Sequence, residues 1–177
     1  TKPLEQVPDF HLCIAPIKKG RIDLVVEKAC ELGVAHVQPV LTRRAVVDKL
    51  NADRLRTQMV EAAEQCGRTG LPTLCELIAL PKLLEAWDEN RTLFFADEQG
   101  GADMRDSFAA HPGPAALLIG PEGGFTDEER AMIRAHPAAV AISLGPRILR
   151  AETAAIAATA CWMALNGDWT RCDMKSI

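Results

Sequence analysis

The sequence lacks the two features that would associate it with a membrane. No apolar run among its 177 residues approaches the roughly 18 to 20 residues that a membrane-spanning helix needs. The first ten residues contain no basic stretch followed by an apolar core, which is the pattern of a secretory signal. We therefore expect a cytoplasmic protein with no membrane partner.

Metal-binding patterns are also missing. The six cysteines contain no C-x-x-C arrangement, and none has a histidine at zinc-finger spacing. Most of them lie in apolar surroundings, where a reduced thiol behaves as a small hydrophobic group. The four histidines are scattered, and His136, which precedes Pro137, is better explained as the end of a helix than as a catalytic base. We expect no metal site and no disulfide framework.

The common nucleotide-binding and nucleophile motifs are absent as well. The chain has no G-x-x-x-x-G-K-[ST], which argues against a P-loop ATPase. It has no G-x-G-x-x-G after its first expected strand, which argues against a Rossmann dehydrogenase and a Rossmann-type methyltransferase. Without a G-x-S-x-G elbow, hydrolase chemistry is disfavoured too.

The net charge of −4 is awkward for an enzyme that acts on nucleic acid, because phosphate contacts favour a basic surface. Local basic clusters do exist. Lys18, Lys19 and Arg21 form one, and Arg43 and Arg44 form another. Such clusters are usually solvated surface, so alone they support RNA binding only weakly.

Apolar runs alternate with amphipathic stretches, which predicts an α/β fold with a mostly parallel sheet flanked by helices. We expect strands over residues 10–17, 36–41, 73–78, 93–96, 115–119 and 138–144. We expect helices over residues 22–32, 55–66, 83–87 and 152–165. A further helix should begin at the capping box Thr126-Asp127-Glu128-Glu129 and end before Pro137.

Two loops that directly follow buried strands are candidates for ligand binding, because ligands bind beyond the carboxyl ends of strands in open parallel sheets. The first loop, residues 120–125, reads Gly-Pro-Glu-Gly-Gly-Phe. Its glycines permit close approach of the backbone to a ligand, and it ends at a helix N-terminus with free amides. A turn that only connects strand and helix fits the composition equally well.

The second loop places Ile148 and Leu149 between two arginines. On ordinary surface, each aliphatic side chain would leave unburied area worth roughly 1.5 to 3 kcal/mol. We therefore expect both to pack on a flat apolar group, such as an adenine ring, or on a partner subunit. Arg147 and Arg150 can meet phosphate, a carboxylate or a base edge. A salt bridge from Arg150 to a nearby glutamate, Glu152 or Glu122, is the alternative.

Four segments resemble the RsmE-type 16S ribosomal RNA uridine-N3 methyltransferases, and they follow the order found in that family. They are residues 27–34 (E-K-A-C-E-L-G-V), 61–68 (E-A-A-E-Q-C-G-R), 118–125 (L-I-G-P-E-G-G-F) and 143–154 (S-L-G-P-R-I-L-R-A-E-T-A). Together they span most of the chain, so the resemblance is far more specific than either loop alone.

The resemblance implies a SPOUT-type domain over residues 10–177, with a C-terminal deep trefoil knot and a homodimeric assembly. It implies S-adenosylmethionine as cofactor and 16S rRNA, or the assembled small ribosomal subunit, as partner. The residues that match the family's cofactor pocket are Leu118, Gly120, Glu122, Gly123, Leu144, Gly145, Ile148 and Leu149. Family members usually carry an N-terminal PUA-like barrel that binds RNA, so residues 1–9 are expected to be a linker from such a domain, which this sequence lacks.

Methylation of uridine N3 requires removal of its proton, and the loops contain no histidine to accept it. We expect Glu122 to act as base or, alternatively, to orient the loop, and Arg147 or Arg150 to stabilise the developing oxyanion. Arg21, Gln65 and Arg68 are candidates for contact with RNA, although the last two could instead brace a dimer. Two rival functions stay open. One is methylation of another RNA target such as tRNA ribose, and the other is a cofactor-binding RNA-docking module without catalysis.

Overall fold

The structure, a computed structural model, describes residues 6–170, and these contain eight strands and six α-helices. The strands are β1 (Phe10–Ile14), β2 (His36–Leu41), β3 (Thr73–Leu74), β4 (Ile78–Ala79), β5 (Thr92–Ala96), β6 (Ala102–Asp103), β7 (Ala115–Ile119) and β8 (Ala139–Ser143). The helices are α1 (Lys19–Glu31), α2 (Ala52–Cys66), α3 (Leu80–Glu85), α4 (Met104–Ala110), α5 (Asp127–Ala135) and α6 (Ala151–Leu165), followed by a 3-10 turn, η1 (Asp168–Thr170).

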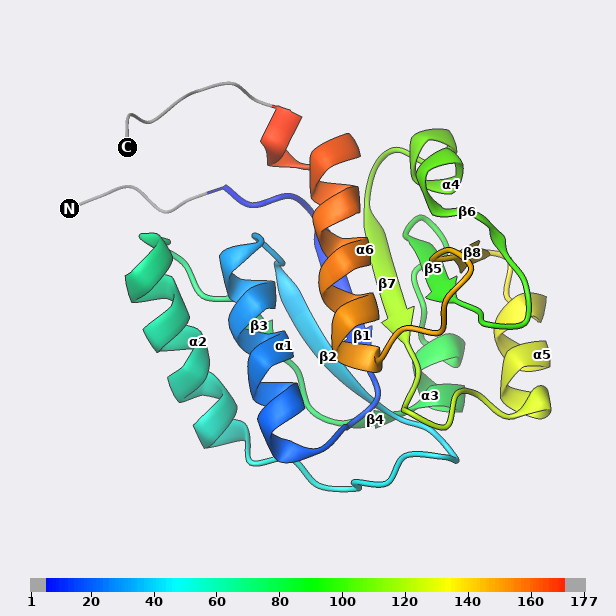
Figure 1. The fold of residues 1–177 in the computed structure, drawn as a ribbon, viewed down its shortest axis with the longest axis horizontal. Helices are drawn as coiled ribbons and strands as arrows, with labels where there is room; N and C mark the ends of the chain where they lie inside the picture. The colour runs from blue at the N-terminus through cyan, green and yellow to red at the C-terminus, as the bar shows by residue number, and fades with distance from the viewer. Residues whose placement is uncertain (1–5, 171–177) are drawn as a thin grey trace.

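All described strand pairs are parallel, which confirms the expected parallel sheet. The strand order is β3-β2-β1-β7-β5-β8-β6 (Figure 1). β4 lies off this path and, like β3, pairs with β2. β7 is central, with Leu117 opposite Leu12 of β1 on one side and Phe94 of β5 on the other. Its five residues are all buried, as an unbroken apolar run predicts for a strand covered on both faces.

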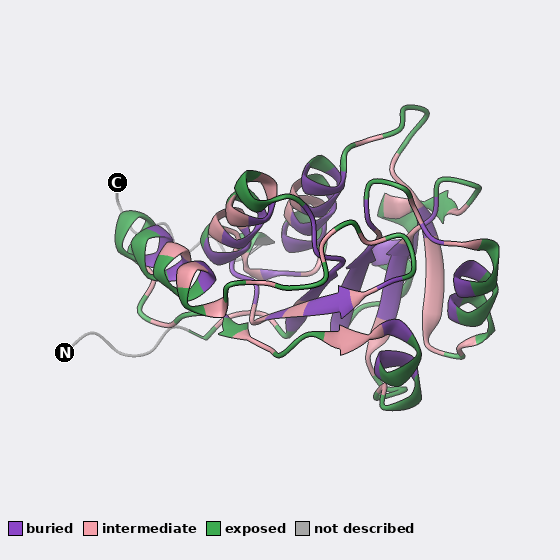
Figure 2. Cartoon of the chain, turned by 90° about the horizontal axis from the view of Figure 1, so that it is seen from below, coloured by how far each residue is buried: buried purple, intermediate pink, exposed green. Residues whose placement is uncertain are grey.

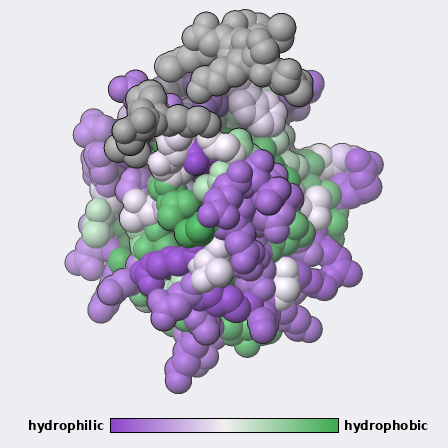
Figure 3. Space-filling view, turned by 90° about the vertical axis from the view of Figure 1, so that its left-hand side faces the viewer, coloured by the Kyte–Doolittle hydropathy of each residue, from purple (hydrophilic) through white to green (hydrophobic). Residues whose placement is uncertain are grey.

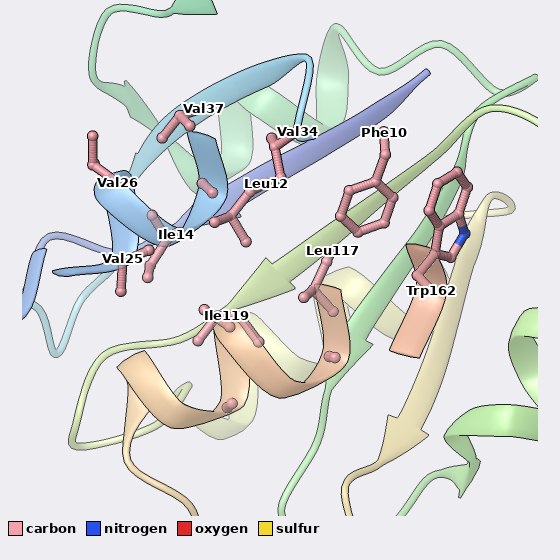
Figure 4. Packing of buried hydrophobic residues seen from close by; sticks show 14 of the residues in the cluster. Phe10, Leu12, Ile14, Val25, Val26, Val34, Val37, Leu117, Ile119 and Trp162 are labelled. Carbon is pink, nitrogen blue, oxygen red and sulfur yellow. The ribbon is translucent and has the colours of Figure 1, made fainter. Parts of the chain in front are cut away.

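Helices cover both faces of the sheet, and alternate residues of each strand point to opposite faces. Leu117 and Ile119 belong to a cluster with α1, α2, α4 and α6, whereas Leu118 belongs to a second cluster with α3 and α5. The rings of Phe10 and Trp162 stack with their centroids 4.4 Å apart (Figure 4). Purple, buried residues accordingly line the strands and the inner sides of the helices (Figure 2).

Several helix ends follow from local sequence. Gly33 and Gly67, after α1 and α2, have φ of 91° and 74°, a left-handed backbone that favours glycine. Thr126 caps α5 by accepting the Glu129 amide, and the Glu129 side chain accepts the Thr126 amide in return. These expectations from the sequence are confirmed.

Other expectations were wrong in detail. β6 and α4 were not expected, because both elements are short and residues 102–110 show no clear hydrophobic period. The strand expected over 73–78 is two short strands, and the helix expected at 83–87 begins earlier, at Leu80. Of the linker expected over residues 1–9, residues 1–5 lie outside the described part of the chain, as do residues 171–177 of the expected domain. Among the described helices, none has the length and apolar character to cross a bilayer.

Candidate cofactor and RNA site

A cavity of about 590 Å³ lies at the carboxyl ends of β7, β5 and β8. Both candidate loops line it, together with the segment that follows β5 and the start of α1 and α6. Its apolar lining consists chiefly of Ile119, Ile142, Leu144, Leu149, Ala151 and Ala154. This size is typical of a small-molecule site. The cavity lies where the general rule for parallel sheets places a ligand.

The first loop is tightly packed against itself and against the segment after β2. A Cβ on Gly120 would lie 3.1 Å from the Phe125 ring, so the close turn favours glycine there. The Arg44 guanidinium donates to the carbonyl of Gly123 at 2.9 Å and thus holds the loop from outside. Gly120 and Glu122 line the cavity, whereas Leu118 and Gly123 do not. Leu118 points instead into the cluster beneath α3 and α5. Neighbouring residues of a strand point to opposite faces of the sheet, and Ile119 is the one that lines the cavity.

The second loop separates the two aliphatic side chains that were expected to act together. Leu144 and Leu149 pack against the main core cluster, whereas the Ile148 side chain is 87% exposed. All three line the cavity. Gly145, with a φ of 98°, makes the turn at the end of β8, and its amide donates to the Ser143 hydroxyl. Leu149 is therefore part of the cavity floor, whereas Ile148 is exposed.

Glu122 is held by an arginine that the sequence did not connect with it. Arg21 Nη1 donates to Glu122 Oε1 at 2.6 Å, and Arg21 Nε lies 3.6 Å from Glu152 Oε1. The salt bridge from Arg150 to either glutamate, which the sequence left open, is absent from the ion pairs of residues 6–170. The two glutamates expected to accept from Arg150 contact Arg21 of α1 instead, and Arg21 and Glu122 are 101 residues apart in the sequence. Arg147 and Arg150 are exposed at the cavity mouth.

The sequence-based prediction missed the third wall of the cavity. Asp97, Glu98, Gly100 and Gly101 line it, together with Arg130 from α5. The segment carries no recognised motif, yet it directly follows the expected strand at residues 93–96. The rule that ligands bind at the carboxyl ends of strands applies equally to this strand and could have identified the wall.

Gln65 and Arg68 lie away from the cavity. The cavity is lined by the first turn of α1, whereas Arg68 donates to the carbonyls of Cys30 and Val34 at the other end of that helix. Gln65 is exposed on α2. The face of the molecule on the side of α2 carries hydrophilic residues interspersed with hydrophobic ones (Figure 3). The structure thus brings Arg21 to the two candidate loops but not these two residues, whose contact with RNA stays a prediction.

No cluster of metal-ligating side chains occurs among the described residues. The five cysteines within that range are free thiols. Burial raises the pKa of Cys13 to about 12, and it also raises the pKa of Cys30, Cys75 and Cys161. These four thiols are therefore protonated at neutral pH and are poor nucleophiles.

The sequence profile of the RNA methyltransferase domain matches residues 4–163. The chain is 33% identical over 152 residues to the ribosomal RNA small subunit methyltransferase E of Rickettsia conorii, covering 84% of this chain and 62% of that protein. It thus spans less than two thirds of that relative.

Two solved structures are similar over almost the whole chain. One is a methyltransferase of Legionella pneumophila with bound S-adenosylmethionine, with a TM-score of 0.83, 35% identity and coverage of 93% of this chain and 70% of that one. The other is the ribosomal RNA small subunit methyltransferase E of Neisseria gonorrhoeae, also bound to S-adenosylmethionine. It has a TM-score of 0.84, 29% identity and coverage of 92% and 68%.

Proposed function

The chain belongs to the RNA methyltransferase domain family, and we propose that it binds S-adenosylmethionine in the cavity and methylates N3 of a uridine in 16S rRNA. The observation that carries the proposal is the convergence of both signature loops on one cavity of about 590 Å³ at the ends of the central strands. The Legionella and Neisseria proteins, which were solved with this cofactor, cover 93% and 92% of this chain.

The lining residues fit the chemistry of the cofactor. The apolar floor, with Leu149 packed on the core and Ile148 exposed above the cavity, suits a flat adenine ring. The two glycine loops bring backbone amides and carbonyls to the edge of that ring. Charged groups at the mouth suit the methionine part, which carries both an ammonium and a carboxylate. When bound, the cofactor supplies an electrophilic methyl group.

The residues around the cavity would then position uridine and stabilise its anion. Arg147 and Arg150 are exposed at the mouth, where a guanidinium can receive the developing charge on the uridine oxygens. Arg21 occupies Oε1 of Glu122 at 2.6 Å, so both carboxylate oxygens become available for the N3 proton when Arg21 is drawn away. We propose that RNA phosphate competes for Arg21 and so frees Glu122. This step gives Arg21 its role in RNA binding.

The finer features that the RsmE resemblance implies belong to the same proposal. They are the deep trefoil knot formed by the chain around the cavity, a homodimer, action on 16S rRNA or the small subunit in the cytoplasm, and an RNA-docking PUA-like barrel in the full-length enzyme. The exposed Ile148 supports the dimer, because a large aliphatic side chain that is 87% exposed gains from burial against a second chain.

Nucleoside mass analysis tests the function. Small subunits lacking the modification are incubated with the protein and S-adenosylmethionine that carries a deuterated methyl group. We expect the label in 3-methyluridine of the 16S rRNA. Label in a 2′-O-methyl nucleoside would favour the rival enzyme, and cofactor binding without any labelled product would favour the docking module.

A variant of the cavity floor tests the site itself. Leu149→Asp puts a charge where the adenine ring is proposed to lie, so we expect cofactor affinity to fall at least about tenfold. Leu165→Asp is the matched control, because Leu165 is 43% exposed at the far end of α6. Equal cofactor affinity in the wild-type protein and Leu149→Asp, measured calorimetrically, would show that this loop is not the adenine wall.

A further inference from the structure

The third wall of the cavity holds a carboxylate that the proposed mechanism does not use. β5 lies between β7 and β8 in the sheet, so the segment after β5 lies between the two signature loops. Asp97 and Glu98 begin this segment, and both line the cavity. The two carboxylates have very different surroundings.

Asp97 is fully occupied by the protein. Its side chain is completely buried, and Oδ1 accepts from Arg130 Nε at 2.9 Å and from the Gln99 amide at 3.0 Å. Its Oδ2 accepts from Arg134 Nη2 at 2.6 Å. Burial alone would raise the pKa of Asp97, but these donors outweigh it and hold the pKa below its ordinary value. Asp97 is therefore an ionised anchor with no capacity left for a ligand.

Arg130 carries this anchoring to Glu98. The arginine is buried, and besides Asp97 it contacts Asp127 through Nη1 at 3.1 Å. Its Nη2 lies 3.9 Å from Glu98 Oε1, within ion-pair range but beyond a hydrogen bond. Asp97 thus fixes a guanidinium that holds the Glu98 carboxylate at the cavity wall.

Glu98 is left with unused hydrogen-bonding capacity. Its side chain is 47% exposed and makes no hydrogen bond to any residue between 6 and 170, whereas Glu122 is engaged by Arg21. The carboxylate also lies directly against the first loop: a Cβ on Gly124 would be 2.7 Å from Glu98 Oε1. Position 124 favours glycine for two reasons. Its φ of 70° lies in the left-handed region, and a side chain there would collide with this carboxylate.

We propose that Glu98 accepts hydrogen bonds from the 2′ and 3′ hydroxyls of the cofactor ribose, and that Arg130 is the residue that positions it. The proposal rests on the proposed function. A carboxylate can bind two adjacent hydroxyls, as acidic residues do in dinucleotide sites. The ribose is the middle part of the cofactor, between adenine and methionine, and Glu98 lies on the cavity wall between the two loops. The Arg130 charge beside Glu98 offsets its negative potential, which suits a neutral diol better than the methionine ammonium.

Calorimetry with cofactor fragments tests this assignment. The probes are S-adenosylmethionine, 5′-methylthioadenosine, which keeps the ribose but lacks the amino acid, and the 2′,3′-dideoxy form of the latter. We expect Glu98→Ala to weaken binding of the first two about tenfold or more, the range for a lost charge-assisted hydrogen bond. Binding of the dideoxy probe should not change. Glu98→Gln, which keeps the shape, should lose affinity in the same pattern, and Glu128→Gln on the exposed side of α5 is the control.

Each other outcome overturns the assignment. Equal loss for the dideoxy probe would mean that Glu98 acts on the cavity as a whole, and loss for S-adenosylmethionine alone would mean contact with the ammonium. Unchanged affinity in both Glu98 variants would leave the proposed function standing without this residue. Failure of the wild-type protein to bind S-adenosylmethionine would instead remove the proposed function. As the test of positioning, Arg130→Lys should lower affinity for 5′-methylthioadenosine in the wild-type background but not in Glu98→Ala.

Discussion

Replacing Gly101 by alanine probes the closest backbone approach in the cavity wall. The segment after β5 passes directly over β8, where a Cβ on Gly101 would lie 2.5 Å from the carbonyl carbon and 2.7 Å from the nitrogen of Ile142. β8 pairs with strands on both sides, so its backbone cannot easily give way. Overpacking of this kind typically costs about 1 to 3 kcal/mol, and we expect Gly101→Ala to fall at the upper end. For a chain of this length that corresponds to a loss of about 4 to 12 °C in Tm.

Thermal unfolding followed by circular dichroism measures the effect, with urea titration as a second determination of stability. Gly20→Ala is the matched control, because a Cβ there meets nothing within 4 Å and the residue lies in α1. Alanine should leave the Tm unchanged or raise it slightly at that position. Gly101 and Ile142 both line the cavity, so cofactor affinity should also fall in Gly101→Ala. Equal Tm values for Gly101→Ala and the wild type would refute the close approach of Gly101 to the Ile142 backbone.

Three further predictions concern stability. Burial, with help from a neighbouring arginine and histidine, lowers the pKa of His11 to about 4 from its ordinary 6.5, so between these values the unfolded chain binds a proton that the folded chain does not. When the pH falls from 7 to 5, the free energy of unfolding of the wild type, measured by urea titration, should fall by about 2 kcal/mol relative to that of His11→Gln. Thr126→Ala should cost about 1 kcal/mol through loss of the helix cap, measured by the same titration, whereas Thr126→Ser retains it. Asp97→Ala should cost about 3 to 5 kcal/mol, because it leaves the buried Arg130 without its main partner, and a change below 1 kcal/mol in urea unfolding would contradict this.

Much of the fold could be predicted because local signals agreed with the tertiary packing. The apolar run at residues 115–119 became the central strand, and the capping box at Thr126 formed as expected. Residues 102–110 gave no such signal, because both residues of β6 are exposed and α4 buries little more than Ser107 and Phe108. Pro81 at the start of α3 was a usable signal for the true start of that helix.

The site was predictable as two loops but not as a network. The loops at 120–125 and 144–150 meet at one cavity because their strands are separated by a single neighbour, β5. The pairing of Arg21 with Glu122 joins residues 101 positions apart and depends on how α1 packs on the sheet. Periodicity and spacing carry no information about such a contact. The split between Leu149 and Ile148 is also tertiary, because only the position of the core decides which of the two is covered.

We expect the cavity at the ends of β5, β7 and β8 to take S-adenosylmethionine. Isothermal titration of the protein with the cofactor tests it most directly, with Leu149→Asp as the site variant. We expect saturable binding that reaches one cofactor per chain and is weakened at least about tenfold in the variant. The absence of binding at millimolar cofactor, or equal affinity in the wild type and Leu149→Asp, would contradict it.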